Sequence, residues 1–198
     1  MQDFSLIDLD NLRQLLQDRL WPSRYIHSLG VADTARDLAR HWHLDETRAY
    51  LAGLLHDSAK SWPEEQLLSL SILYGIPVDS WTLDHPDLLH GPVAAAMLID
   101  EWDIEDEEIE KAIRCHTLPD KDMSSFDMIV FLADKIEPNR KPWDGLEQLR
   151  KLAYEDLERA MEFSLEHCME YVRDKDGEVH PCTQEIWEFY RNRKQQRS

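Results

Sequence analysis

The sequence predicts an all-α protein, and three observations support this fold class. Apolar residues recur at spacings of three and four along almost the whole chain, which is the period of an α-helix. The 198 residues include only 6 Gly, whereas the helix-forming residues Leu, Ala, Glu and Arg are abundant. Residues that begin or end helices, such as Pro22 and Pro138, stand at the edges of the periodic segments. We therefore expect a helical bundle.

Three helices are expected near the N-terminus. Pro22 suits the first turn of the second helix, where a missing backbone N–H costs nothing, and Asp45 can cap the third. The second helix places His27 on the same face as Val31 and Ala35. The expected bounds are about 8–20, 22–41 and 45–60.

The middle of the chain contains further short helices. Prolines within 61–89 predict a short helix followed by a loop. A Ser-x-x-Asp pattern at Ser124 and Asp127 resembles a capping box, and Pro138 ends the helix that follows it. The expected helices cover about 64–74, 91–102, 106–117 and 124–137.

The C-terminal part is expected to extend the bundle. A long amphipathic helix is predicted from Gly145 to about Arg173, and Thr183 can cap a last helix. The sequence contains no internal repeat and no strong second-domain boundary. We therefore expect residues 1–198 to form one domain, with a core of about 20–140 and C-terminal helices over about 145–195.

Composition limits the classes of partner. The formal net charge of −18 argues against nucleic-acid polymers and anionic membranes, because such partners require basic faces. It leaves room for a small phosphate-bearing ligand that is held by metal ions and local cations. The 3 cysteines without a paired spacing, and an N-terminus without an apolar leader, predict a soluble cytoplasmic protein with reduced thiols. The oligomeric state is left open, with a homodimer as one alternative.

Several histidines and aspartates fall on faces that are otherwise apolar. His56 and Asp57 lie within the apolar segment LAGLLHDSAK, although one His-Asp pair is expected by chance in a chain of this composition. A single buried histidine is most often satisfied by the core around it. Burying six such groups without a shared partner would cost several kcal/mol for each group. A metal centre accounts for all of them together, since neutral imidazoles and carboxylates are metal ligands. These residues are His27, His56, Asp57, His90, His116 and Asp134.

This ordered set resembles the signature of the HD-domain metal-dependent phosphohydrolases. The segments HSLGVADTARDLA, AGLLHDSAK, LLHGPVAA, CHT and FLADKIEPNR are similar to the YqeK branch of that family. The resemblance covers about residues 20–160 and continues weakly through VHPCTQEIWEFYRNR. It implies symmetrical hydrolysis of dinucleoside tetraphosphates, in which diadenosine tetraphosphate gives two ADP.

The resemblance also implies roles for individual residues. The six histidines and aspartates match the ligands of a dinuclear centre, with iron as the expected metal and manganese or cobalt as alternatives. Asp57 would bridge two divalent ions that hold a hydroxide as the nucleophile. Lys60 matches a lysine of the family and is expected to act in catalysis on a substrate phosphate. Arg140 and Glu137 are expected to bind the small nucleotide substrate.

The sequence departs from the family after two of these motifs. His116 is followed by TLPDKDMS and Arg140 by KPWDG, where the family usually continues Thr-Thr-Gly and a Phe-Pro-Gly-like turn. Neither change alters a matched ligand. Two alternatives to this function also stay open: another HD-domain enzyme that acts on nucleotides or cyclic dinucleotides, and a non-catalytic sensor of metal or nucleotide.

Overall fold

The structure of the protein is a computed structural model that describes residues 4, 7–175 and 177–197. Within these ranges the regular elements are helices, as the sequence predicts. In chain order they are α1 (Leu9–Arg19), α2 (Pro22–His41), α3 (Glu46–Leu55), α4 (Glu64–Leu73), α5 (Ser80–Asp84), the 3-10 helix η2 (Pro86–Leu89), α6 (His90–Ala96), α7 (Leu98–Trp102), α8 (Glu107–Cys115), α9 (Ser125–Ile136), α10 (Leu146–Glu155), α11 (Leu157–Asp174) and α12 (Pro181–Arg197).

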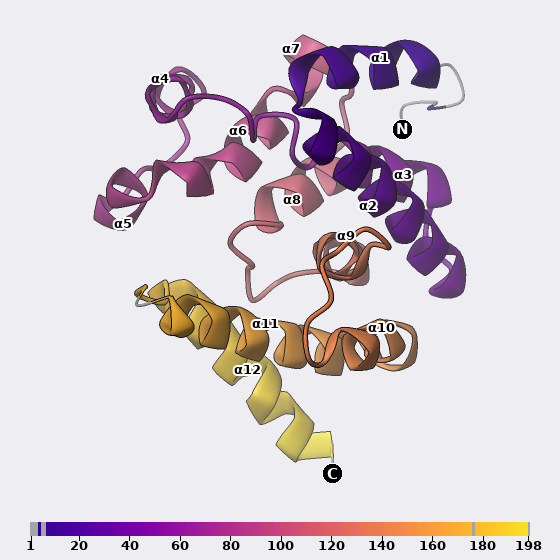
Figure 1. The fold of residues 1–198 in the computed structure, drawn as a ribbon, viewed down its shortest axis with the longest axis vertical. Helices are drawn as coiled ribbons and strands as arrows, with labels where there is room; N and C mark the ends of the chain where they lie inside the picture. The colour runs from indigo at the N-terminus through magenta and orange to yellow at the C-terminus, as the bar shows by residue number, and fades with distance from the viewer. Residues whose placement is uncertain (1–3, 5–6, 176, 198) are drawn as a thin grey trace.

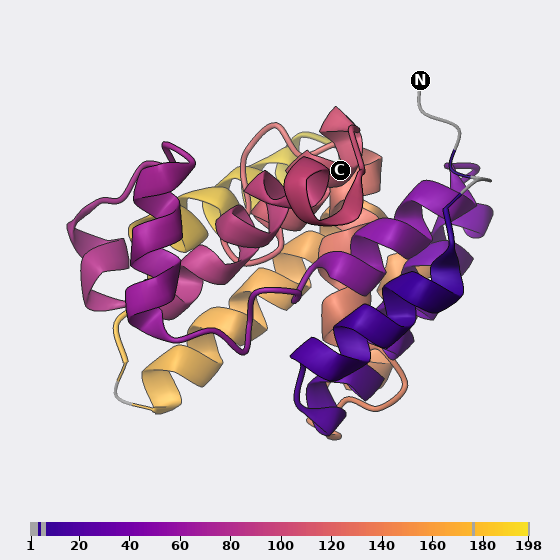
Figure 2. The ribbon, with the colours of Figure 1, turned by 90° about the horizontal axis from the view of Figure 1, so that it is seen from above.

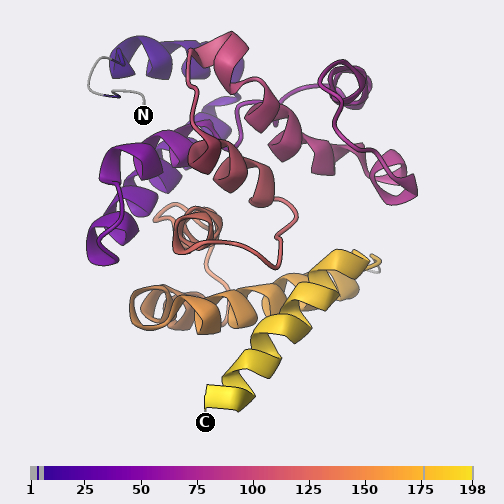
Figure 3. The same ribbon diagram turned by 180° about the vertical axis from the view of Figure 1, so that it is seen from behind.

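Helix α9 lies at the centre of the arrangement. It contacts α2, α3 and α8 on one side and α10 and α11 on the other (Figure 1). Helix α12 crosses the outer side of α11, as the view from behind shows (Figure 3). The view from above places α4 and α5 at the opposite end of the molecule from α1 (Figure 2). Because α9 is covered on several sides, almost every residue along it is buried.

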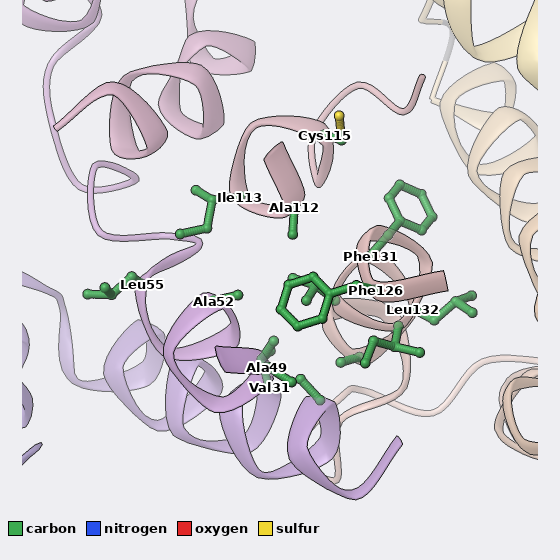
Figure 4. Packing of buried hydrophobic residues seen from close by; sticks show 14 of the residues in the cluster. Val31, Ala49, Ala52, Leu55, Ala112, Ile113, Cys115, Phe126, Phe131 and Leu132 are labelled. Carbon is green, nitrogen blue, oxygen red and sulfur yellow. The ribbon is translucent and has the colours of Figure 1, made fainter. Parts of the chain in front are cut away.

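One continuous apolar core joins these helices. Figure 4 shows where side chains of α2, α3, α8 and α9 meet, with Phe126 of α9 near Ala49 of α3 and Val31 of α2. Helices α2 and α3 pack closely because Gly53 has no side chain: a Cβ at this position would lie 2.8 Å from the Cα of Ala32. Gly53 therefore serves helix packing.

The predicted caps are present at two helix starts. The Asp45 carboxylate accepts hydrogen bonds from the backbone N–H groups of Thr47 and Arg48 at the start of α3. Ser124 and Asp127 form a reciprocal capping box at the start of α9. These local signals confirm where α3 and α9 begin.

The third helix is shorter than predicted. The periodicity suggested a helix to about residue 60, but α3 ends at Leu55 and tight turns follow. In these turns the N–H of Ser58 donates to the carbonyl of Leu55, and that of Lys60 donates to the carbonyl of Asp57. Neighbouring residues of a regular helix point about 100° apart. Leaving the helix at this point lets His56 and Asp57 face the same site.

Other predicted boundaries also needed correction. The helix expected over 91–102 is divided at Met97 into α6 and α7, and the one expected over 145–173 is divided at Asp156. Asp156 has an extended backbone, and its carboxylate caps α11 by accepting the N–H of Arg159. The predicted loop before residue 90 contains α5 and η2, and α12 begins at Pro181 rather than at Thr183.

In the described ranges we find no helix with both the length and the apolar character needed to cross a lipid bilayer.

Candidate metal centre

The structure brings all six predicted ligands into one buried cluster. His27 comes from α2, His56 and Asp57 from the turns after α3, His90 from the start of α6, His116 from the end of α8, and Asp134 from α9. Each of these residues is at most 7% exposed. Segments that are far apart in sequence therefore converge on a single site.

Asp57 lies between two halves of this cluster. Its Oδ1 is 3.1 Å from His90 Nε2 and 3.6 Å from His116 Nε2. Its Oδ2 is 3.2 Å from His56 Nε2 and 3.7 Å from His27 Nε2. Asp134 belongs to the second half, with Oδ1 3.0 Å from His27 Nε2. Two groups of ligand atoms that could each hold a metal ion therefore share Asp57.

The hydrogen bonds behind three of the histidines fix which nitrogen faces the site. Nδ1 of His56 lies 2.6 Å from the carbonyl oxygen of Gly53, and Nδ1 of His116 lies 2.6 Å from that of Ile113. Nδ1 of His90 bonds the carbonyl oxygen of Asp87 in the same way. A carbonyl oxygen only accepts, so in each case Nδ1 carries the proton. In the neutral ring, Nε2 is then a bare lone pair that points into the cluster.

These inward lone pairs have no proton to share. The Nε2 atoms of His27 and His56 are buried without a hydrogen-bond partner. The Nε2 atoms of His90 and His116 face each other at 3.1 Å. Buried acceptors in such an arrangement are costly unless a cation lies among them. The donor set of imidazole nitrogens and carboxylate oxygens fits a metal ion.

The charge states around the cluster favour a cation. Burial lowers the pKa of His116 to about 4, so this imidazole is neutral at pH 7. Burial acts to raise the pKa of Asp57, but the positive charge that His56 can carry and the neighbouring imidazoles hold it well below its usual range. Burial likewise acts to raise the pKa of Asp134, which Lys135 and His27 hold well below its usual range. Both carboxylates are therefore ionised.

His56 differs from His116 in its response to these carboxylates. Burial acts to lower the pKa of His56, but the negative charge of Asp57 more than offsets this and raises it. A proton on Nε2 of His56 would occupy the position of a metal ligand bond. Metal and proton are therefore expected to compete at this nitrogen.

Four cationic side chains surround the cluster. Arg24 Nη1 lies 2.7 Å from Asp57 Oδ2, and Lys135 Nζ lies 2.6 Å from Asp134 Oδ2. Arg140 bonds both the side chain and the backbone carbonyl of Asp134. Lys60 approaches from the opposite half, with Nζ 3.7 Å from Asp87 Oδ2 and 3.4 Å from His90 Nδ1. The site thus has a positive rim although the chain is acidic.

Two of these cations were not singled out from the sequence. Arg24 precedes His27 by three residues, so helical spacing puts both side chains on the same side of α2. Lys135 directly follows Asp134 in the DKIEPNR segment. Their sequence positions close to predicted ligands were the feature from which their place at the site could have been predicted. Arg24 and Lys135 are otherwise indistinguishable from solvated helix residues.

Glu137 lies behind His27 instead of facing open space. It is 1% exposed, and its Oε1 is 3.1 Å from His27 Nδ1. Its Oε2 accepts the backbone N–H of Asn139 at 2.6 Å. Gly30 makes room for this carboxylate, because a Cβ there would lie 2.5 Å from Oε2. These contacts favour orientation of His27 over the predicted contact with substrate.

Comparison with known proteins supports this assignment of the cluster. The HD-domain family model matches residues 24–139, a range that contains all six clustered residues. The chain is 36% identical to a Bacillus subtilis protein named bis(5'-nucleosyl)-tetraphosphatase, symmetrical, over 85% of this chain and 89% of that one. A Staphylococcus aureus protein of the same name is 31% identical over 93% of this chain and 95% of its own length.

A solved structure extends the similarity to three dimensions. The crystal structure of a Clostridium acetobutylicum protein, described as a predicted HD superfamily hydrolase involved in NAD metabolism, superposes with a TM-score of 0.89. The two proteins are 35% identical, and the match covers 94% of this chain and 98% of the other. The chain therefore belongs to the HD-domain family, and within it to the YqeK-type branch that includes these relatives.

Proposed function

We propose that the protein is a metal-dependent hydrolase that cuts dinucleoside tetraphosphates at the central anhydride. The observation that carries this proposal is the pair of buried ligand groups sharing Asp57, which fits a site for phosphoester or phosphoanhydride hydrolysis. The names of the Bacillus subtilis and Staphylococcus aureus relatives supply the substrate class. Diadenosine tetraphosphate would give two ADP.

We propose two divalent metal ions for this site. One would be held by His27, His56, Asp57 and Asp134, and the other by Asp57, His90 and His116, with Asp57 bridging them. Iron is the metal we expect, with manganese or cobalt as alternatives, because mixed nitrogen and oxygen ligands suit these ions better than magnesium. When bound, such a pair lowers the pKa of water and neutralises charge on phosphate oxygens.

The cationic rim would hold the tetraphosphate. Lys60 and Arg140 lie on opposite halves of the cluster, so they can bind phosphate oxygens on both sides of the attacked phosphorus. Arg24 and Lys135 pair with the carboxylates of Asp57 and Asp134, and they would be free to join them if those carboxylates held metal ions. Fixed cations stabilise the charge that develops as the bond breaks, without having to reorganise.

The bond changes define a symmetrical reaction. The oxygen of water adds to an inner phosphorus, and the bond from that phosphorus to the central bridging oxygen breaks. The bridging oxygen leaves with the other nucleoside diphosphate, whose emerging negative charge Lys60 or Arg140 would offset. Each product is then a nucleoside diphosphate, and one of the two carries the solvent oxygen.

We further propose that residues 1–198 act as one domain. The family match ends at residue 139, but α9 of the matched part packs against α10 and α11 of the extension. A shared core of this kind makes independent folding of α10–α12 unfavourable.

Hydrolysis in oxygen-18 water tests the proposed reaction. Protein loaded anaerobically with Fe(II), or with Mn(II), should convert diadenosine tetraphosphate to ADP only, with half of the ADP labelled on its terminal phosphate. ATP and AMP as primary products would contradict symmetrical cleavage. Parallel incubations with a cyclic dinucleotide and with mononucleotides distinguish the other HD-domain activities. No turnover of any of these, with metal bound, would favour a sensor.

A further inference from the structure

The segment between α3 and α4 carries three of the site residues on consecutive tight turns. His56 and Asp57 belong to the ligand cluster, and Lys60 lies on its rim. The N–H of Lys60 donates to the carbonyl of Asp57 at 2.9 Å, and the N–H of Trp62 donates to the carbonyl of Ala59 at 3.1 Å. A displacement of Trp62 would therefore move the backbone of Lys60.

The side chain of Lys60 is held loosely by its own contacts. Its Nζ lies 3.7 Å from Asp87 Oδ2 and 3.4 Å from His90 Nδ1, and both distances exceed the usual length of a hydrogen bond. Nδ1 of His90 already donates its proton to the carbonyl of Asp87, so it cannot accept one from Lys60. The place of the ammonium group therefore depends on the backbone of the turn.

Trp62 is fixed at the end of these turns by a residue of α1. The guanidinium carbon of Arg19 lies 5.4 Å from the centroid of the Trp62 ring and 4.8 Å from that of the Trp102 ring. Arg19 Nη2 also lies 2.6 Å from Glu101 Oε2. Arginine suits this position, because a planar guanidinium stacks on aromatic faces while its N–H groups bind a carboxylate. Arg19 thus joins the turn to α7.

This contact has a firm base. Leu12 and Leu16 of α1 and Trp102 of α7 are buried. The side chain of Arg19 is itself only 23% exposed, and a cation over an aromatic ring is bound more strongly where water is excluded. Helix α1 lies before residues 24–139, which the family model matches. An element outside the matched range therefore holds the turn that carries Lys60.

We propose that Arg19 is a positioning residue that fixes Lys60 beside the metal centre by holding Trp62. The proposal rests on the proposed function, in which Lys60 binds a phosphate of the substrate. Arg19 would act through Lys60 and bind neither metal nor phosphate. A displacement of about 1 Å in a group that orients the reacting atoms can cost about 100-fold in rate. A loosened turn should therefore slow turnover.

The metal ligands of the same segment should stay in place without Arg19. Nδ1 of His56 lies 2.6 Å from the carbonyl oxygen of Gly53, and Arg24 lies 2.7 Å from Asp57 Oδ2. These short contacts fix both ligands independently of Trp62. Loss of Arg19 should therefore affect Lys60 and leave the metal content unchanged.

A double-mutant cycle with Arg19→Ala and Lys60→Ala tests the proposal on metal-loaded protein. The kcat/KM for diadenosine tetraphosphate should fall roughly 5- to 50-fold in Arg19→Ala, and no further than in Lys60→Ala, with both variants retaining metal. In the Lys60→Ala background, Arg19→Ala should change kcat/KM by less than about 2-fold, because the residue through which Arg19 acts is missing. A purely structural role would lower kcat/KM by the same factor in both backgrounds.

Arg13→Ala is the matched control. Arg13 also lies on α1, with its guanidinium carbon 5.4 Å from the centroid of the Tyr50 ring, and its Nη2 donates to the Tyr50 hydroxyl at 2.7 Å. Its removal breaks a similar contact between α1 and the core, but on α3 and not on the turn. We expect a lower Tm with kcat/KM within about 2-fold of the wild type. An equal fall in kcat/KM in Arg13→Ala and Arg19→Ala would overturn the proposal.

Binding of inorganic diphosphate separates this proposal from the proposed function. Its affinity for metal-loaded protein reports on Lys60 without any bond being cut, and the two substitutions should be non-additive in this measurement too. Non-additive losses of affinity in protein that does not cut diadenosine tetraphosphate would support the positioning role and refute the reaction. Wild-type values in Arg19→Ala or in Lys60→Ala, or losses that multiply in the double variant, would overturn the role of Arg19. If circular dichroism shows that Arg19→Ala is unfolded, Arg19→Met keeps the apolar length without the cation and replaces it in the cycle.

Discussion

His90 and His116 point their Nε2 atoms at each other across 3.1 Å, although each ring already donates its Nδ1 proton to a backbone carbonyl. Two lone pairs at this distance repel unless a positive charge lies beside them. The nearest carboxylate oxygen, Asp57 Oδ1, is itself an acceptor 3.1 Å from His90 Nε2. In this half of the site, the packing of the surrounding helices therefore keeps the two imidazoles and the carboxylate together despite the repulsion between their acceptor atoms.

Metal binding should consequently stabilise the fold. An ion at about one hundred times its Kd adds about 3 kcal/mol to the free energy of unfolding if it binds only the native state. Thermal unfolding of metal-free and manganese-loaded protein should show this as a higher Tm in the loaded sample. His116→Ala should lose part of the increase. An equal Tm with and without metal would argue against a metal site at this cluster.

Metal content should report the division of the cluster into two halves. We expect two ions per chain in the wild type, about one in His116→Ala, and none or nearly none in Asp57→Ala, because Asp57 is the residue that the two groups of ligand atoms share among the described residues. Elemental analysis of folded, desalted protein measures this. His41→Ala is a matched control, since His41 lies at an exposed helix end and bonds the carbonyl of Tyr154. Retention of both ions in Asp57→Ala would refute the shared ligand.

Loss of a rim cation should impair turnover but not metal binding. A permanently cationic side chain does not ligate a metal, so Lys60→Ala and Arg140→Ala should keep their metal. Their kcat/KM should fall roughly 10- to 1000-fold, the scale of a removed charge stabiliser. Lys151→Ala serves as the control, because Lys151 is exposed and pairs only loosely with Glu155. If the folded Lys60 or Arg140 variant is purified without bound metal, the role proposed for that residue is wrong.

Glu137 offers a test that separates positioning from substrate contact. Glu137→Gln keeps the shape but weakens the acceptor for His27 Nδ1, and a lost orienting partner typically costs 10- to 100-fold in metal affinity. Competition with a chelator measures that affinity. Gly30→Ala should act in the same direction, since its Cβ would displace Glu137 Oε2. A rise in KM with unchanged metal affinity would instead restore the original expectation that Glu137 binds substrate.

The sequence predicted the cluster because its members share helix faces with apolar residues. His27 lies in register with Val31 and Ala35, and all three are buried. Periodicity reports which way a side chain faces, and on several helices of one small bundle that is enough to predict convergence. Periodicity does not predict where a helix ends so that consecutive residues can face one site. The end of α3 at Leu55 was missed for this reason.

The rim and the contacts of Arg19 were harder to anticipate. Arg24 is a half-exposed arginine whose role depends on Asp57, a residue on another element. Arg19 lies over the rings of Trp62 and Trp102 although long stretches of chain separate the three residues. Local patterns carry no information about such long-range neighbours, so the three-dimensional structure was needed to find them.

The position of Asp57 between two histidine pairs has a consequence for a cell short of metal. The Asp57 carboxylate offers one oxygen to each half of the cluster. An ion bound in one half therefore fixes the side-chain torsion of Asp57, on which binding in the other half depends. The two binding events are then thermodynamically linked, and the linkage is reciprocal. Where this ordering of the carboxylate outweighs the repulsion between the two cations, scarcity of metal would leave some molecules fully loaded and the rest empty. The supply of metal would then set how many copies work, while each working copy keeps its full rate.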